Sequence, residues 1–407
     1  MPETNKGVVP RLRFPEFRDA GPWEVKRLGK LFKERTERGG EDLELLSVTI
    51  SDGVVRASEL ERKNNASADL SNYKRVQPGD IVYNSMRMWQ GASGVSHWHG
   101  LVSPAYTVVT PVDNQNPVFW SYHFKLSHSV DKFARFSQGL TSDTWNLKYP
   151  AFSAIKMAFP PDPAEQQKIA DCLSSLDEVI ELEAKRLDAL KAHKKGLLQQ
   201  LFPREGETTP RLRFPEFRDA GPWEVKRLGD KRIAKFVRER VSPERIPLGH
   251  YVSTVNLLPD FAGLSPAPEP PPPNSAVAYR KGDILMSNIR PYLKKIWIAD
   301  RSGGASNDVL VVRPGENTVG GFLGQILMSD RFVAHVMDGA KGVKMPRGDL
   351  KQIQDFEVPL PQKAEQQKIA DCLSSLDELI ELQAQKLDAL KAHKKGLLQQ
   401  LFPQEVA

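Results

Sequence analysis

The 407-residue chain has only two cysteines, Cys172 and Cys372. Two cysteines in so long a chain do not make a disulfide framework or a zinc knuckle, and a cytoplasmic protein is the default expectation. The sequence also lacks an apolar run of the roughly 18 residues that a membrane span needs. The first residues, MPETNKGVVPRLRF, lack the apolar core of a secretory signal peptide.

Catalytic motifs are missing as well. There is no G-x-x-x-x-G-K-[ST] loop for nucleotide phosphates and no G-x-G-x-x-G after a strand. Residues 116–119 (NPVF) resemble the Asn-Pro-Pro-aromatic element of amino-methyltransferases but lack the second proline. His97 and His99 have no carboxylate or cysteine nearby that would complete a metal site. The sequence therefore predicts a binding protein with no catalytic residues, no metal and no cofactor of its own.

The charge balance is modestly basic. Lysine and arginine number 57 against 51 aspartates and glutamates, which gives a net charge of +6. A surplus of this size is compatible with a nucleic-acid partner but does not establish one.

The strongest feature of the sequence is an internal repeat. The 20 residues PRLRFPEFRDAGPWEVKRLG occupy positions 10–29 and return unchanged at 210–229. We call these two stretches the lead segments. Identical residues in equivalent places cannot distinguish two different targets, so the lead segments are expected to form a fixed scaffold.

A second repeat follows each half of the chain. Residues 164–203 return at 364–403, with changes only at positions 179, 183, 185 and 186; we call these the helical segments. Their leucines and isoleucines alternate in spacings of three and four, the heptad pattern of a coiled-coil seam. At a rise of about 1.5 Å per residue, ~38 residues make a helix of roughly 57 Å. The seam positions are Ile169, Leu173, Leu176, Ile180, Leu187, Leu190, Ile369, Leu373, Leu376, Ile380, Leu387 and Leu390.

The ends of the helical segments carry helix signals. Asp162 is predicted to be the N-cap, Pro163 the first helical residue and Glu165 the glutamate of a capping box. Pro203 and Pro403 are expected to end the two helices. We expect the two copies to pack antiparallel on each other; the alternative is that each helix lies on its own domain.

The segments between the repeats, which we call the middle segments, differ in sequence but share rare features. Gly79-Asp80-Ile81 leads eight residues on to Arg87, and Gly282-Asp283-Ile284 leads eight residues on to Arg290. Short β-branched and aromatic runs at 80–84, 105–110, 283–287, 295–299 and 308–314 predict strands. The stretches 116–137 and 319–337 predict helices.

Together these patterns predict an α+β protein in which two mixed α/β domains alternate with two long helices. We place the first domain at 1–160, the central helical spacer at 161–206, the second domain at 207–360 and the distal spacer at 361–407. Two similar domains on a paired helix suit a target with two sites at fixed spacing. DNA is such a target, because equivalent sites recur with each turn of roughly 34–36 Å.

This arrangement resembles the specificity (S) subunit of type I restriction–modification systems. The residues that carry the resemblance are WEVKRLG in the lead segments, PLPQKAEQQKIADCL, LDALKAHKKGLLQQLFP and the Gly-Asp-Ile elements that precede Arg87 and Arg290. The resemblance implies two target-recognition domains that bind a bipartite, asymmetric site in double-stranded DNA. It also implies two methyltransferase (M) subunits and two restriction/translocase (R) subunits as partners, which would hold AdoMet, ATP and Mg²⁺.

Candidate DNA contacts lie in loops of the middle segments. Base recognition uses Arg or Lys on guanine and Asn or Gln on adenine. Arg87 and Arg290 occupy equivalent positions, which suits a phosphate contact or a structural ion pair as well as base readout, whereas the later loops diverge and are better readers. The candidates are Ser85, Arg87, Gln90, Thr141, Ser142, Asn146, Lys148, Asn288, Arg290, Tyr292, Lys294, Lys295, Lys341, Lys344 and Arg347.

A different class of function remains open from the sequence. A coiled-coil adaptor with two protein-binding heads would show the same repeat without binding DNA. Such heads should expose apolar patches, whereas DNA-reading heads should align Arg, Lys, Asn and Ser on one side.

Overall fold

The structure is a computed structural model that describes residues 8–40, 42–60, 69–266, 276–340 and 345–403. The chain divides into two compact units: unit 1 comprises Met1–Ala184 and Lys386–Ala407, and unit 2 comprises Lys185–Gln385. Each unit therefore contains one middle segment and one half of each long helix. The sequence-based boundaries at 160/161, 206/207 and 360/361 separate domains from helices instead, and they stay a prediction.

Unit 1 is built on a small antiparallel sheet with the order β2-β9-β6-β7. Its central strands are buried on both faces, because Ile81, Tyr83 and Val109 belong to one hydrophobic core and Val82 and Val108 to another. The strands are β2 (Phe32–Glu34), β6 (Ile81–Asn84), β7 (Ser93–Val95) and β9 (Tyr106–Pro111). Three antiparallel pairs complete the unit: β1 (Glu24–Arg27) with β10 (Lys156–Phe159), β3 (Leu46–Thr49) with β4 (Gly53–Arg56), and β5 (Lys74–Val76) with β8 (Gly100–Val102).

Three short helices cover the sheet of unit 1: α1 (Pro117–Phe124), α2 (Ser127–Phe136) and α3 (Tyr149–Ala154). Helix α1 begins where the sequence favours it, because the Asn116 side chain accepts a hydrogen bond from the Phe119 amide and Pro117 takes the first helical position. The predicted helical stretch 116–137 is divided, since α1 ends before Lys125 and Leu126 and a second helix follows.

Unit 2 repeats this sheet with the order β12-β19-β16-β17. Its strands are β12 (Ala234–Phe236), β16 (Ile284–Ser287), β17 (Ile296–Ile298) and β19 (Val309–Pro314), and the pair β11 (Glu224–Arg227) with β20 (Glu357–Leu360) matches β1 with β10. A second four-stranded sheet, β13-β15-β18-β14, is mixed because β14 and β18 run parallel. Its strands are β13 (Arg240–Val241), β14 (Tyr251–Val252), β15 (Ala276–Tyr279) and β18 (Gly303–Ala305).

The helices of unit 2 follow the same order: α5 (Gly320–Leu327), α6 (Asp330–Asp338) and α7 (Leu350–Gln354). Again the predicted stretch 319–337 is split in two, here by Met328 and Ser329. The strands expected in both middle segments are present, and the α+β class is confirmed.

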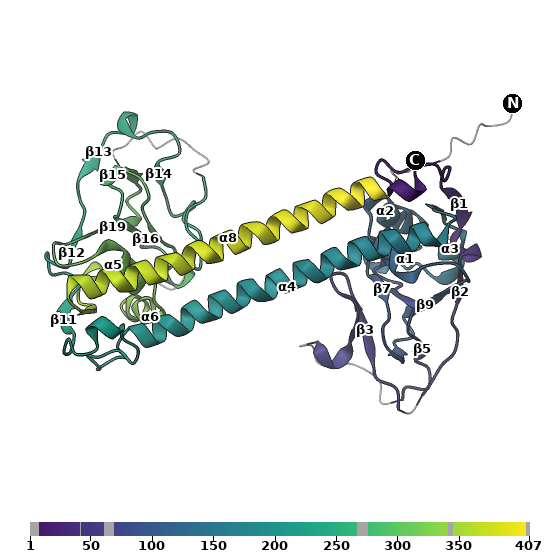
Figure 1. Ribbon diagram of the computed structural model, residues 1–407, viewed down its shortest axis with the longest axis horizontal. Coiled ribbons are helices and arrows are strands. Elements are labelled where there is room, and N and C mark those ends of the chain that lie inside the picture. Colours follow the sequence, from purple (N-terminus) through teal and green to yellow (C-terminus); the bar gives the residue numbers. More distant parts are fainter. Residues whose placement is uncertain (1–7, 41, 61–68, 267–275, 341–344, 404–407) are drawn as a thin grey trace. The chain divides into compact units, whose positions relative to one another are not determined.

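The helical segments form α4 (Pro163–Leu201) and α8 (Lys363–Leu401), which are labelled in Figure 1. Asp162 caps α4 as expected, since its carboxylate accepts from the Ala164 amide at 2.8 Å. The helices pack antiparallel: in unit 1 Lys386 of α8 pairs with Glu183 of α4 at 2.5 Å, and Lys394 pairs with Asp177. The expected antiparallel seam is confirmed.

The lead segment of unit 1 is hydrogen-bonded to both long helices. The Leu12 amide donates to the Gln400 carbonyl of α8 at 3.0 Å, while Arg13 donates to both carboxylate oxygens of Glu165 in α4, at 2.8 and 2.6 Å. Trp23 Nε1 adds a third donor to Glu165 at 3.3 Å. The capping-box role predicted for Glu165 is therefore wrong, because its buried carboxylate is taken by these two side chains.

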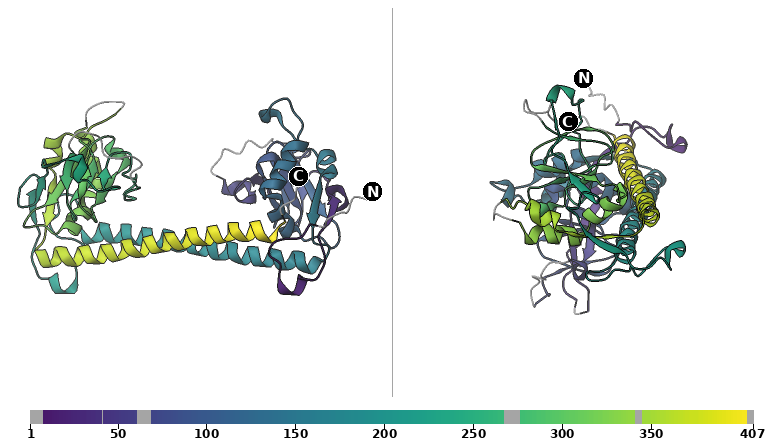
Figure 2. Two further views of the ribbon diagram at one scale, coloured as in Figure 1. Left: turned by 90° about the horizontal axis from the view of Figure 1, so that it is seen from above. Right: turned by 90° about the vertical axis from the view of Figure 1, so that its left-hand side faces the viewer.

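Unit 2 repeats the contacts of the lead segment almost atom for atom. The Leu212 amide donates to the Gln200 carbonyl at 2.9 Å, and Arg213 donates twice to Glu365 at 2.7 Å. In each unit the loop of the lead segment lies on the opposite side of the helix pair from the sheet (Figure 2). The lead segment is a strap that fixes the helix pair to the globular part.

Each core is closed by a phenylalanine from the end of a long helix. Phe402, which follows α8, stacks on Phe119 with a centroid distance of 5.2 Å, and Phe202, which follows α4, stacks on Phe322 at 5.3 Å. Ile169 and Leu173 at the start of α4 join the same core in unit 1. The repeated segments thus supply both the strap and part of the core.

Candidate nucleic-acid interface

The Gly-Asp-Ile elements shape the turn that leads to the candidate residues. Asp80 is 1% exposed and accepts from Arg35 Nε at 2.7 Å, Thr110 Oγ1 at 2.7 Å and the Gln77 amide at 2.8 Å. The hydrogen bond to Asp80 raises the pKa of Arg35. The aspartate in this motif therefore has a structural role, because it holds the turn in front of β6.

In unit 1 the turn after β6 meets the loop 139–148. The Leu147 amide donates to the Ser85 carbonyl at 2.8 Å, and the rings of Trp89 and Trp145 make an edge-to-face contact at 5.4 Å. The two segments that the sequence singled out separately are thus brought together. Within them Arg87 and Gln90 are exposed, whereas Ser85 is 4% exposed and hydrogen-bonds Thr107 at 2.8 Å. Ser85 supports the loop from inside and is not available for DNA.

The loop 139–148 is itself ordered by local hydrogen bonds. Gln138 and Asn146 exchange both backbone hydrogen bonds, at 3.1 and 2.9 Å. Thr141, Ser142 and Lys148 are exposed. The side-chain oxygen Oδ1 of Asn146 is buried and has no hydrogen-bond partner among the described residues. The loop offers hydroxyl groups and an ammonium group to a partner at its surface.

Unit 2 brings its two candidate segments together in the same way. The Gly348 amide donates to the Asn288 carbonyl at 3.1 Å, and the Arg290 amide donates to the Pro346 carbonyl at 2.8 Å. Arg290 is exposed and has a φ of 50°, a left-handed conformation that costs a side-chain-bearing residue free energy and is enriched at functional sites. Arg347 is exposed and pairs with Asp308 at 2.9 Å.

The remaining candidates of unit 2 are placed differently. Tyr292 is 48% exposed. Lys294 pairs with Asp330 at 2.7 Å, and this hydrogen bond raises the pKa of Lys294. Lys295 donates to the Thr254 carbonyl at 2.7 Å. Both lysines therefore have partners within unit 2, while Lys341 and Lys344 lie outside the described residues.

Two arginines beside this surface were missed by the sequence analysis. Arg238 and Arg240 lie on the stretch that joins β12 to β13, and both are exposed. Arg240 donates to the Asn307 side chain at 2.6 Å. Their spacing of two residues places them on one side of an extended strand, but this spacing by itself predicts no site.

The residues predicted for the seam are buried or half-buried in α4 and α8. Ile169, Leu173 and Leu187 are buried in α4, and the matching Ile369, Leu373 and Leu387 are buried in α8. Leu176, Ile180, Leu190, Leu376, Ile380 and Leu390 are half-buried. A polar pair also joins the two helices, since Lys194 of α4 donates to Asp377 of α8 at 2.5 Å in unit 2.

Two kinds of feature are absent from the part of the chain that the structure describes. No group of three or more His, Cys, Asp or Glu side chains is placed to hold a metal ion there. None of the described helices combines the length and the apolar character that crossing a bilayer requires.

Comparison with known proteins identifies the family. Residues 21–192 and 274–392 match the family described as the type I restriction modification DNA specificity domain, and they make up more than half of the chain. The type I restriction enzyme MjaVIII specificity subunit of Methanocaldococcus jannaschii is 23% identical, with 98% of this chain and 95% of that protein aligned. The putative type I restriction enzyme MjaX specificity subunit of the same organism is 23% identical, with 93% and 90% aligned.

Solved structures show the same fold. The S subunit of a type I restriction–modification system from M. genitalium aligns with a TM-score of 0.59 at 16% identity, covering 98% of this chain and all of that one. A chain from a structure of type I restriction–modification complex assembly aligns with a TM-score of 0.53 at 15% identity, covering 94% and 98%. With the family match in both halves of the chain, the repeated scaffold and the paired helices, the chain belongs to the family of type I restriction–modification specificity subunits.

Proposed function

We propose that each unit binds one half of a bipartite, asymmetric site in double-stranded DNA, and that the paired helices set the spacing between the two halves. The observation that carries this proposal is the contrast within each unit: a repeated strap and seam support two loops that differ between units. Shared parts serve a shared geometry, and exposed parts that differ suit two different half-sites. The adaptor alternative is not favoured, because the chain belongs to the specificity-subunit family.

The side chains proposed to contact DNA are the exposed members of the predicted set together with the half-buried Asn146 and Asn288. Hydroxyl, amide and guanidinium groups suit base edges, and the cations also suit phosphates. Ser85 is left out because it is buried. In unit 1 the proposed contacts are Arg87, Gln90, Thr141, Ser142, Asn146 and Lys148, and in unit 2 they are Asn288, Arg290, Tyr292 and Arg347.

We also propose that the chain is non-catalytic and that its partners are two methyltransferase and two restriction/translocase subunits, which would bind AdoMet, ATP and Mg²⁺. One observation supports a paired partner. Val179 and Leu182 on α4 are 42% and 66% exposed, and the equivalent Leu379 and Leu382 on α8 are 51% and 61% exposed. Two equivalent apolar patches, one in each unit, suit two copies of one partner.

This stoichiometry can be tested by changing one patch at a time. In Leu182→Asp the patch of unit 1 gains a charge that a partner would have to desolvate, so we expect one methyltransferase subunit per chain instead of two. Light scattering of the purified complex measures the ratio, and Leu382→Asp is the matched variant in unit 2. Two bound methyltransferase subunits in both variants would contradict the proposed contact.

A segment exchange tests the assignment of half-sites to units. Because the lead and helical segments are repeated, residues 230–360 should fit in place of residues 30–160. The expected target then contains the half-site of unit 2 twice, in inverted orientation, and no longer contains the half-site of unit 1. Methylome sequencing of cells that carry the exchanged chain with its methyltransferase shows the target. A change in both half-sites would contradict the assignment.

A further inference from the structure

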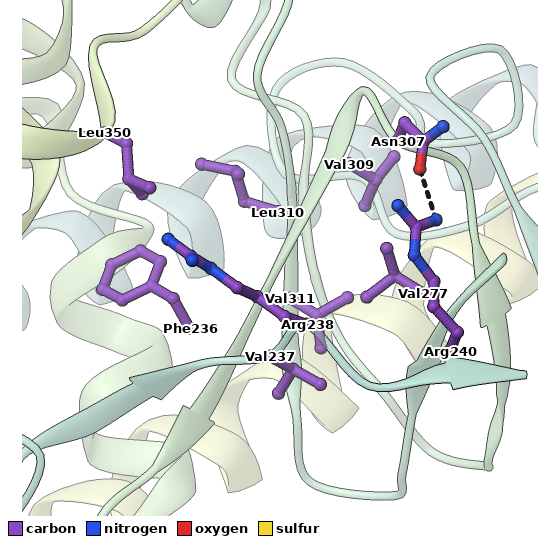
Figure 3. A pocket seen from close by; sticks show the side chains of 10 residues that line it. All are labelled: Phe236, Val237, Arg238, Arg240, Val277, Asn307, Val309, Leu310, Val311 and Leu350. Atoms are coloured by element: carbon purple, nitrogen blue, oxygen red, sulfur yellow. Dashed lines mark hydrogen bonds between the residues drawn. The ribbon is translucent and has the colours of Figure 1, made fainter.

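Unit 2 has an open cavity of about 300 Å³ beside the candidate interface (Figure 3). The cavity combines an apolar floor with two arginines and an asparagine. The lining residues are Phe236, Val237, Arg238, Arg240, Val277, Asn307, Val309, Leu310, Val311 and Leu350. None of them belongs to the set predicted from the sequence.

The two arginines give this cavity a positive rim. Within the described part of the chain Arg238 makes no ion pair, and both arginines reach the solvent. Glu239 lies between them in sequence, but its carboxylate pairs with Lys235 at 3.0 Å and with Arg313 at 3.6 Å. Because side chains alternate along an extended strand, Glu239 points to the other side and does not neutralise the rim.

The cavity is continuous with the surface proposed to bind DNA. Asn307 accepts from Arg240 at 2.6 Å. The next residue, Asp308, pairs with Arg347 at 2.9 Å, and its carbonyl accepts from the Asn288 amide at 2.8 Å. The rim therefore adjoins the segments that carry Asn288 and Arg347.

The chemistry of the lining suits the sugar and the phosphate of a nucleotide better than its base. The apolar floor that a ligand can touch is formed by the half-buried Phe236, Leu310 and Leu350, whose side chains offer no hydrogen bond to a base edge. Figure 3 shows Arg238 extending toward Phe236 and Leu310, with Arg240 held at the other side by Asn307. Guanidinium groups bind phosphate oxygens strongly, and apolar walls suit the carbon face of a sugar.

We propose that Arg238 and Arg240 hold the sugar–phosphate backbone of the half-site that unit 2 reads, with the deoxyribose against the apolar floor. This inference rests on the proposed DNA-binding function. The subsite is specific to unit 2. The backbone pairing of Arg240 with Val277 has a counterpart in unit 1, the β-bridge between Arg38 and Lys74. Two residues before Arg38, however, unit 1 has Thr36 where unit 2 has Arg238. The subsite adds affinity without adding sequence information.

The experiment measures the salt dependence of DNA binding. The purified chain, with its methyltransferase subunit, is titrated with target DNA and with unrelated DNA of the same length between about 50 and 200 mM salt. Each phosphate contact that is lost lowers the log–log salt slope by about 0.9, so Arg238→Gln with Arg240→Gln should lower it by nearly two. The factor by which affinity falls across this salt range should then be roughly tenfold smaller for the double variant than for the wild type.

Two further variants sharpen the measurement. Arg238→Lys with Arg240→Lys keeps both charges and should keep the wild-type slope. Arg232→Gln removes an exposed arginine of the same unit that pairs with Asp230 at 2.9 Å, and it should change nothing. In the double glutamine variant, target and unrelated DNA should weaken by the same factor and the methylated sequence should stay the same.

The outcomes separate the two levels of the proposal. An unchanged slope in the double glutamine variant overturns the phosphate subsite while leaving the DNA-binding function intact. A changed target base overturns it in favour of base readout by these arginines. Absence of any salt-sensitive binding by the wild-type complex overturns the DNA-binding function itself, and the subsite with it.

Discussion

In unit 1 the buried aspartate of the Gly-Asp-Ile element is neutralised by Arg35, which follows β2, whereas in unit 2 the equivalent Asp283 is neutralised by Arg313 on β19. Both aspartates are almost fully buried. The ion pair is present in both units, although its arginine comes from a different part of the fold in each. A buried carboxylate needs a cationic partner, but that partner can come from any neighbouring segment. Two middle segments can therefore share a fold with little shared sequence.

The strap shows the opposite behaviour. The two ion pairs of the strap, Arg13–Glu165 and Arg213–Glu365, have nearly equal distances. Trp23 and Trp223 each add a third donor to the glutamate at 3.3 Å. Here the sequence is identical, and the same contacts form beside two different middle segments. The comparison separates a fixed scaffold from replaceable domains.

The largest expected difference between the units concerns the phenylalanines that close their cores. Phe402 is 2% exposed and contacts Trp23, Phe119 and His123, whereas Phe202 is half-buried and contacts Trp223 and Phe322. Phe402→Ala should destabilise unit 1 by about 4 kcal/mol, and Phe202→Ala should destabilise unit 2 by about 2 kcal/mol. Native-state hydrogen exchange in β6 and β16 reports the two units separately.

The control for this pair is Phe136→Ala, which truncates a phenylalanine of unit 1 that is 41% exposed. It should cost less than about 1 kcal/mol. Equal losses in Phe402→Ala and Phe202→Ala would show that the two cores use the helix ends equally and would remove this difference between the units.

A second difference is acid sensitivity. His123 of α1 is fully buried between Ser129 and the Ala158 carbonyl, and burial lowers its pKa to about 3. A histidine whose folded pKa lies below the unfolded value of about 6.5 contributes stability above pH 6.5 that is lost as the pH falls toward the folded pKa. Unit 2 has Ile326 at the equivalent position.

Unit 1 should therefore lose about 2 kcal/mol between pH 7.5 and pH 5 through His123. Urea denaturation of the wild type and of His123→Gln at both pH values isolates this contribution, because the glutamine stays neutral. The free-energy difference between the two proteins should shrink by that amount at pH 5. A difference that does not change with pH would mean that His123 is not held neutral in unit 1.

The scaffold was largely predictable from the sequence, whereas the site was predictable only in part. The exact repeats and the heptad pattern predict the long helices and their pairing, because helix formation and helix pairing both depend on local periodicity. The meeting of Asn288 with Gly348 depends on a contact between residues far apart in sequence, and no local pattern encodes it. Ser85 is among the DNA contacts predicted from the sequence, but Thr107 on the neighbouring strand satisfies its hydroxyl inside the fold.

Arg238 and Arg240 show a different limit. Their spacing is visible in the sequence, yet alternate charges on a strand are usually solvated and predict no site by themselves. The cavity forms only when β12 and β19 pair and Leu350 packs nearby. The sign and spacing of charges can be read along a chain, but the concavity that makes them a site requires the fold.

The smallest expected effect lies where the replaceable domains contact the scaffold. Tyr122 of α1 donates to Asp177 of α4 at 2.6 Å, and Lys394 of α8 pairs with the same carboxylate. In unit 2 the corresponding donor is Gln325, at 3.2 Å from Asp377. The hydroxyl of Tyr122 is half-buried beside a charged acceptor, so Tyr122→Phe should cost about 1 kcal/mol, and Gln325→Met should cost less because its hydrogen bond is longer.

A double-mutant cycle between Tyr122→Phe and Asp177→Asn tests whether this cost belongs to the contact. We expect a coupling of about 0.5–1 kcal/mol in the hydrogen-exchange stability of unit 1. Ser174→Ala is the matched control, since its hydroxyl lies 3.4 Å from that of Tyr122 at the limit of a hydrogen bond. If the coupling is zero, the domain is attached to the helices by its apolar core alone, and a newly introduced middle segment would need no donor at position 122 to be held in register.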